Sequence, residues 1–116
     1  MGITQRRGKA GEDLAVAYLE LAGFRLAARN VRLAGVEVDV LADDGATRVL
    51  VEVRVRTRGD FGGAAATVDR RKRERLVRAA RSLEQQGHTR IRVDVLAVDV
   101  TADGARLTHY RNAVTE

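Results

Sequence analysis

The most informative stretch of this 116-residue chain is TRVLVEVRVR, residues 47–56. Valine occupies every second position from 49 to 55, and the positions between them hold Leu50, Glu52, Arg54 and Arg56. This period of two predicts a β-strand with one apolar and one largely charged face. Residues 36–42 alternate in the same way, with Val36, Val38 and Val40 on one face, and residues 43–45 predict a hairpin turn between the two strands. The hairpin is therefore expected to show Asp39 and Glu52 on one face.

The rest of the pattern predicts two helices and five strands in the order αβββαββ. Apolar residues at helical spacing predict a largely buried helix over residues 9–22, which ends at Gly23. An amphipathic helix is expected from about residue 69 to 86, after a loop at 57–67. Further strands are expected at 24–31, 91–98 and 105–110. Asp94, within the fourth strand, is expected to be a polar group that supports the fold.

Length and composition set the broad class. A chain of this size can bury a single core, so we expect one α/β domain over residues 1–116. It has no Cys, which excludes zinc ribbons, thiol nucleophiles and iron–sulfur clusters. No apolar run approaches the roughly 20 residues that cross a bilayer, and the first 20 residues lack a signal-peptide core. We therefore expect a cytoplasmic protein with no membrane partner.

Positive charge is concentrated in one part of the chain. Residues 54–81 contain ten of the 21 Lys and Arg residues and only three of the 16 acids. Four arginines would line the outer face of the second helix, which favours contact with a polyanion over an ordinary solvated surface: Arg71, Arg75, Arg78 and Arg81. Lys72 and Arg73 are expected to lie over the sheet edge. Because few aromatic residues are present, phosphate and shape recognition of duplex or branched DNA fits better than base stacking.

Two carboxylates on neighbouring strands make a candidate metal site. Asp39 and Glu52 would face the same side, and oxygen ligands of this kind suit Mg²⁺ or Mn²⁺. The pattern Asp, then about a dozen residues, then Glu-x-Arg approximates the Asp…(Asp/Glu)-x-Lys arrangement of metal-dependent nucleases. The alternative is that both acids form cross-strand ion pairs with Arg54 and Arg56. Glu12 lies at the edge of the apolar surface of the first helix, where a carboxylate is costly unless something binds it.

Several segments together resemble one protein family. They are QRRGKAGEDLAVAYLELAGF (5–24), GVEVDVLA (35–42), VLVEVRVRTRGDFGG (49–63), RRKRERLVRAAR (70–81) and IRVDVLAV (91–98). This combination resembles the YraN family of small bacterial proteins, whose fold is similar to that of restriction endonucleases and Holliday junction resolvases in the PD-(D/E)XK superfamily. The resemblance implies a restriction-endonuclease-like domain with a mixed central sheet flanked by two helices. It also implies a DNA-binding protein with metal-dependent endonuclease activity. The sequence leaves the oligomeric state open, with a homodimer as one option because recognition of a symmetric or branched duplex often uses a two-fold dimer.

The resemblance also implies roles for individual residues. Glu12, Asp39 and Glu52 would hold Mg²⁺ or Mn²⁺, and Glu37 belongs to the same motif as Asp39. Arg54 stands where the family has lysine; it can hold a phosphate but is unsuited to accept a proton. Contacts to nucleic acid are expected from Arg56, Arg58, Arg71, Lys72, Arg73, Arg75, Arg78 and Arg81.

The arginine at position 54 leaves alternatives open. Lys72, or less favourably Lys9, would have to supply an ammonium from elsewhere in the chain, since these are its only lysines. A second reading is a non-catalytic nucleic-acid-binding module that kept the scaffold and lost the chemistry. A third is a scaffold that docks an acidic protein partner.

Overall fold

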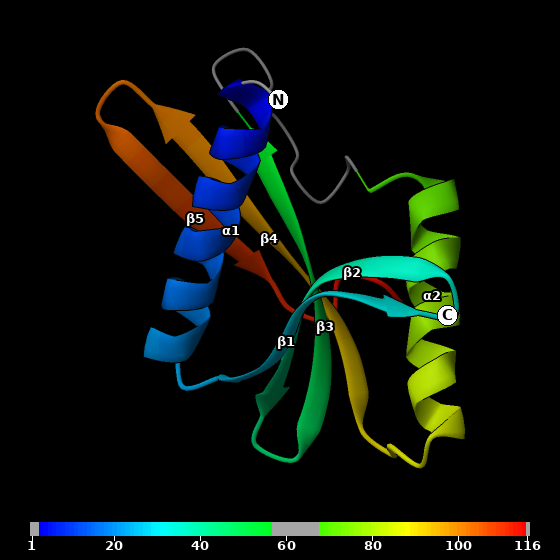
Figure 1. Cartoon of the computed structure of the whole chain (residues 1–116). Coiled ribbons are helices and arrows are strands. Elements are labelled where there is room, and N and C mark those ends of the chain that lie inside the picture. Colours follow the sequence, from blue (N-terminus) through cyan, green and yellow to red (C-terminus); the bar gives the residue numbers. More distant parts are fainter. Residues whose placement is uncertain (1–2, 57–67, 116) are drawn as a thin grey trace.

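The computed structural model describes residues 3–56 and 68–115, with side chains from residue 9 onward. A five-stranded sheet lies between two helices (Figure 1). The elements are α1 (Ile3–Leu21), β1 (Arg25–Leu33), β2 (Val36–Asp44), β3 (Thr47–Arg56), α2 (Arg70–Gln85), β4 (Ile91–Thr101) and β5 (Gly104–Tyr110). The expected αβββαββ order is confirmed, and α1 begins six residues earlier than its predicted start at residue 9.

The strands follow one another across the sheet in the order β1-β2-β3-β4-β5. All neighbours are antiparallel except β3 and β4, which run parallel. Parallel neighbours need a crossover connection, and α2 belongs to it. The sheet is therefore mixed, and α2 lies against one face of it, mainly over β4 and β2.

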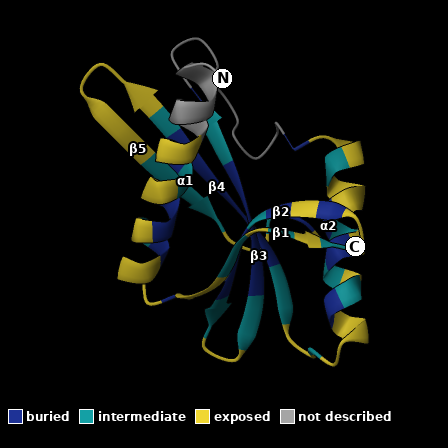
Figure 2. Cartoon of the chain, viewed as in Figure 1, coloured by how far each residue is buried: buried dark blue, intermediate teal, exposed yellow. Residues whose placement is uncertain are grey.

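The alternation in β3 divides the core into two layers. Val49, Val51 and Val53 pack in a cluster with residues of α1, whereas Leu50 packs in a second cluster with Leu76 and other residues of α2. Buried residues accordingly line both faces of the central strands (Figure 2). Glu52 and Arg54 follow Leu50 at intervals of two residues, so their side chains lie on the same face, the α2 side of the sheet.

β2 does not keep one face toward one helix. Val36 and Val38 pack in the α2 cluster, whereas Val40 packs in the α1 cluster, although the three are spaced by two. The expectation that they share one packed face is therefore wrong, because the strand twists between Val38 and Val40. The ladder to β3 ends at the same point, at the Val40–Val51 pair, and Asp39 lies at the twist.

α1 is less buried than its sequence predicts. Ala15 and Leu19 are buried against the sheet, but Leu14 is 43% and Leu21 90% exposed. The helix contacts the sheet on one side only, so its second apolar stripe faces outward (Figures 1 and 2). The prediction of a largely buried helix was wrong because periodicity cannot show how many neighbours a helix has.

The close approach of α1 to β3 depends on Gly11. A Cβ at this position would overlap Cγ2 of Val55. Gly11→Ala should therefore lower the melting temperature, because overpacking costs about 1–3 kcal/mol and outweighs the ~1 kcal/mol that alanine adds to helix propensity. Thermal unfolding of Gly11→Ala, Val55→Ala and the double variant tests this. The double variant should lose less stability than the two single losses combined, and strict additivity would contradict the contact.

Candidate functional site

Glu52 carries its carboxylate into a buried position on the α2 side of β3. The residue is 4% exposed, and its Oε1 has no hydrogen-bond partner among the described residues. Its Oε2 lies 3.1 Å from Nζ of Lys72 and 3.8 Å from NH1 of Arg54. One carboxylate oxygen is thus held by two cations, and the other has no donor while Asp39 is ionised.

Asp39 is half-buried beside Glu52. Its Oδ2 accepts a hydrogen bond of 2.8 Å from the backbone N–H of Val53, which replaces a ladder bond where β2 leaves β3. Burial, followed by the negative charge of Glu52, raises the pKa of Asp39 from 3.8 to about 7, against the opposing effects of the Val53 N–H and of Lys72. The two carboxyl groups therefore compete for negative charge near neutral pH.

The structure does not bring Glu12 into this pair. Its Oε1 lies 3.6 Å from NH2 of Arg29 on β1, and the same arginine is 2.8 Å from Asp13. Within residues 9–56 and 68–115, no three acidic, His or Cys side chains come together in a way that could hold a metal. Glu37 is exposed and lies 4.0 Å from Arg32. The sequence correctly indicates that Glu12 needs a partner, and among these contacts its partner is an arginine.

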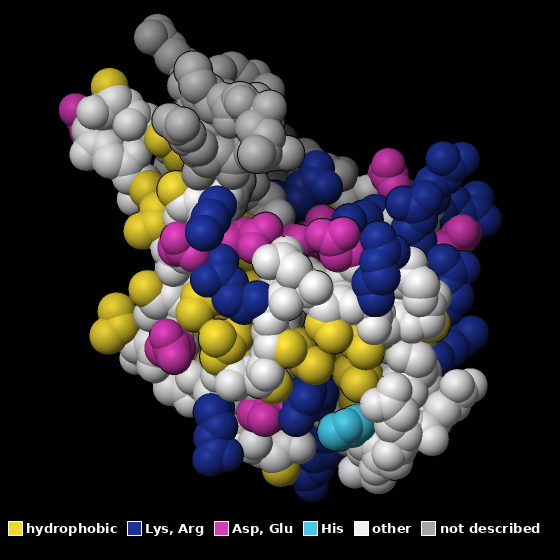
Figure 3. Space-filling model, viewed as in Figure 1, with side chains coloured by type: hydrophobic (Ala, Val, Ile, Leu, Met, Phe, Trp, Pro, Cys, Tyr) yellow, Lys and Arg dark blue, Asp and Glu magenta, His cyan; other side chains and the backbone are white. Residues whose placement is uncertain are grey.

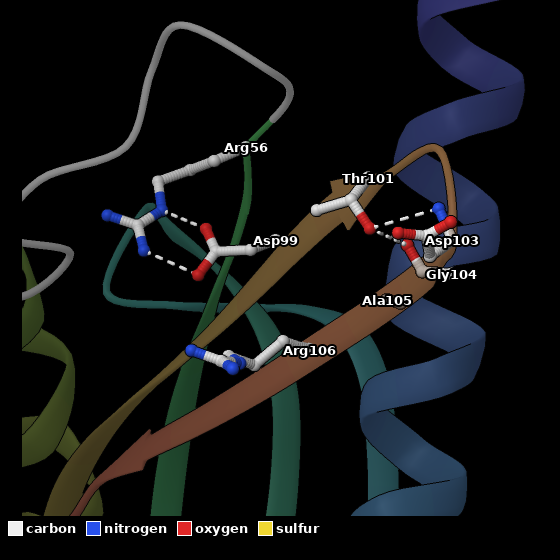
Figure 4. Close-up of a pocket in the computed structure, with 7 residues that line it drawn as sticks. All are labelled: Arg56, Asp99, Thr101, Asp103, Gly104, Ala105 and Arg106. Carbon is white, nitrogen blue, oxygen red and sulfur yellow. Dashed lines mark hydrogen bonds and ion pairs between the residues drawn. The ribbon is translucent and has the colours of Figure 1, made fainter.

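Arg56 points to a different acid from Glu52. Its guanidinium donates two hydrogen bonds, of 2.6 and 2.8 Å, to the carboxylate of Asp99 on β4, as Figure 4 shows. Arg56 and Asp99 are partners in the parallel register of β3 and β4. The alternative that Arg56 pairs with Asp39 or Glu52 is thus replaced by an ion pair that fastens the two parallel strands. Asp99 could not be predicted as the partner of Arg56, because the register of parallel strands cannot be read from local sequence.

Cationic side chains cover the exposed side of α2. Figure 3 shows Lys and Arg gathered over this helix, and acidic side chains in a band between it and α1. The exposed members predicted to contact nucleic acid are Arg71, Arg73, Arg75, Arg78 and Arg81. Lys72 instead turns to Glu52, and its side chain is 31% exposed. Arg58 lies outside the described residues.

Asp69 fixes the start of this cationic helix. It is the N-cap of α2, and its Oδ1 accepts a hydrogen bond of 2.8 Å from the backbone N–H of Lys72. The sequence pattern predicts a helix start near this residue. An Asp directly before a helical segment is also a typical N-cap signal, from which the cap itself could have been predicted.

Comparisons with known proteins place the chain in a family. The model of the uncharacterised protein family UPF0102 matches residues 11–98. The chain belongs to this family. A UPF0102 protein of Halorhodospira halophila is 45% identical over 82% of this chain and 78% of its own length. Another, from a Janthinobacterium species, is 41% identical over 95% of this chain and 88% of its own. The resemblance to the YraN family is confirmed.

A solved structure supports the fold of this UPF0102 protein. The crystal structure of a repair endonuclease from Pyrococcus abyssi matches 81% of this chain and 39% of that longer chain, with a TM-score of 0.51 and 19% identity. The predicted restriction-endonuclease-like fold, with its mixed sheet between two helices, is confirmed. None of the helices described here is long and apolar enough to span a membrane.

A second buried acid lies on the other side of the sheet. Asp94 is fully buried and accepts hydrogen bonds from His109 Nε2 at 2.7 Å, from Arg92 at 2.8 and 3.0 Å, and from the Asn112 N–H at 2.9 Å. Burial opposes its ionisation, but these hydrogen bonds outweigh it and lower the pKa of Asp94. Nδ1 of His109 lies 3.1 Å from the Tyr18 hydroxyl. Asp94 thus ties β4, β5, α1 and the C-terminal turn together, as a fold-supporting residue.

The raised pKa of Asp39 predicts how stability depends on pH. Between about pH 4 and 7 the folded protein keeps a proton on Asp39 that the unfolded chain has lost, so stability falls as pH rises through this range. Asp39→Asn keeps an acceptor for the Val53 N–H and removes the charge. It should raise the free energy of unfolding by roughly 1–3 kcal/mol more at pH 8 than at pH 5.

Chemical denaturation at the two pH values checks this expectation. Glu37→Gln is the matched control, because it removes an exposed acid from the same strand and should have little effect at either pH. Equal effects of Asp39→Asn at pH 5 and pH 8 would show that the pKa of Asp39 is not raised in the folded protein.

Proposed function

We propose that this protein binds DNA and hydrolyses phosphodiester bonds with a divalent cation held by Asp39 and Glu52. The observation that carries the proposal is the unpartnered, buried Oε1 of Glu52 beside a second carboxyl group whose pKa is raised to about 7. Leaving a charged oxygen buried without a partner is costly, and a cation between the two groups would remove both that cost and their repulsion.

The donor set fits Mg²⁺ or Mn²⁺. Both ligands are hard carboxylate oxygens, and Mg²⁺ typically takes only one or two carboxylates, with water and substrate phosphate completing its shell. A pair of acids without a third is therefore sufficient. Glu12, which contacts Arg29, is not one of the two ligands in this proposal.

The chain's own groups would bind and orient the phosphodiester. When bound, the cation supplies Lewis-acid activation of the phosphate and of the attacking water. Arg54 lies two residues after Glu52 on the same face of β3. It would donate hydrogen bonds to a phosphate oxygen and offset the negative charge that develops during the reaction. The water oxygen forms a bond to phosphorus while the bond to the leaving oxygen breaks. The leaving oxygen takes a proton from solvent, and the water releases one to solvent.

Cleavage of branched, nicked and linear DNA with Mn²⁺ tests this function. We expect wild-type protein to cleave at least one of these substrates and Glu52→Ala to lose the activity. The Glu52→Ala protein, purified in the same way, also excludes a contaminating nuclease. DNA binding without cleavage by wild-type protein would contradict the catalytic proposal.

A second candidate function rests on Arg54. This residue replaces the lysine of the related nucleases, so the chain could be a nucleic-acid-binding module without chemistry. The same cleavage panel separates the two functions. Cleavage by Arg54→Lys, with none by wild type, would identify a nuclease scaffold that has lost its activity. Absence of nucleic-acid binding at low salt would instead favour a protein partner.

Four outer-face arginines of α2 are proposed to follow a phosphate backbone: Arg71, Arg75, Arg78 and Arg81. Replacing Arg71 and Arg75 by Gln should weaken binding to all sequences alike and reduce the slope of log affinity against log salt by up to about two, since each lost contact releases one counterion fewer. Titrations of a labelled duplex at several salt concentrations measure this slope.

A control with the same change in charge locates the surface. Arg25 and Arg90 are exposed and lie at the other end of the sheet, near Asp43 and Arg48. Their double replacement by Gln should leave the salt slope nearly unchanged. An unchanged slope in the Arg71 and Arg75 variant would instead place the nucleic acid on another face.

A further inference from the structure

We propose that Lys72 supplies, from the first turn of α2, the ammonium that faces the reacting phosphate. In the related nucleases this group comes from the strand position that Arg54 occupies here. The inference rests on the proposed nuclease function and adds one group to it. Lys72 would remain charged throughout, donating hydrogen bonds to a phosphate oxygen beside Glu52.

The contacts at Glu52 support this assignment. Lys72 Nζ lies 3.1 Å from Glu52 Oε2, within hydrogen-bond distance, whereas the nearest Arg54 nitrogen is 3.8 Å away. The only ammonium among the described contacts of the carboxylate pair therefore comes from the helix.

The chain holds Lys72 in place from both sides. Its backbone N–H is bound by the N-cap Asp69, and Leu76, one turn later, is fully buried in the core under α2. The side chain of Lys72 is 31% exposed, so the protein covers most of its aliphatic chain, and its ammonium group reaches Glu52. By contrast, the Arg70–Glu74 pair of the same helix has side chains 94% and 69% exposed, as an ordinary surface pair does.

The position of Lys72 near the N-terminus of α2 does not stabilise the helix. The first turn of α2 contains no acid, and a cation at a helix N-terminus opposes the helix dipole. In the described structure, Lys72 and Arg54 balance the two carboxylates. A divalent cation would add two positive charges, which matches one phosphodiester and one hydroxide ion.

The alternative is that Lys72 only neutralises Glu52. An arginine at position 72 would then serve equally well, and position 54 would not matter. The two possibilities differ in where an ammonium is needed, so moving the ammonium from the helix back to the strand separates them.

The experiment measures single-turnover cleavage at saturating protein, with Mn²⁺, for wild type, Lys72→Met, Lys72→Arg and Lys72→Met/Arg54→Lys. Lys72→Met keeps the stem and should slow cleavage by about 10²-fold, a loss typical of removing one group that stabilises developing charge. Lys72→Arg should remain impaired, and the double variant should recover at least tenfold over Lys72→Met. Arg70→Met, which removes an exposed cation from the same turn, should cleave like wild type.

The outcomes separate this inference from the proposed function. Cleavage at the wild-type rate by Lys72→Met or Lys72→Arg, or a double variant no faster than Lys72→Met, would overturn the role of Lys72 and leave the nuclease function standing. No cleavage by any variant, including wild type, would overturn both. Melting temperatures of all variants show whether a loss of activity reflects unfolding.

Discussion

Glu52 carries a carboxylate into the face of the sheet that α2 covers, where it is 4% exposed. An ionised group in such a position is costly unless cations and donors surround it. Lys72 and Arg54 both converge on one of its oxygens, and the pKa of the neighbouring Asp39 rises to about 7. The N-cap of α2 holds Lys72 and the twist of β2 places Asp39, so each positions one group around this charge.

Two buried acids on adjacent strands differ in how completely their carboxylate oxygens are hydrogen-bonded. Glu52 on β3 faces α2, whereas Asp94 on β4 belongs to the opposite side, with Tyr18 of α1 in its hydrogen-bonded network. Asp94 is bound by three residues, and its pKa is lowered. Glu52 keeps an unpartnered oxygen next to a second acid. A satisfied acid stabilises the fold, while the unsatisfied pair has capacity left for a ligand.

Local sequence patterns predicted the elements and much of the candidate site. The alternation in β3 placed Glu52 and Arg54 on one face, and the position of Lys72 on the apolar side of α2 indicated that it would reach the sheet. The twist of β2 and the Arg29 contact of Glu12 could not be predicted in this way, because they depend on how distant segments meet. The same limit applies to the exposed stripe of α1, since amphipathicity reports apolar surface and not the presence of a neighbour.

The parallel pairing of β3 and β4 also shapes how the chain reaches this state. β2 and β3 are neighbours in sequence and can pair locally, but Arg56 meets Asp99 across 43 residues of chain. Closing such a loop costs entropy before any contact repays it, so we expect this pairing to form more slowly than the local β2–β3 hairpin. A nascent chain whose β4 has not left the ribosome would hold Asp39 and Glu52 on a hairpin that lacks its parallel neighbour. Asp39 and Glu52 are therefore synthesised before α2 and β4, the elements that follow them in the chain and complete the fold around them.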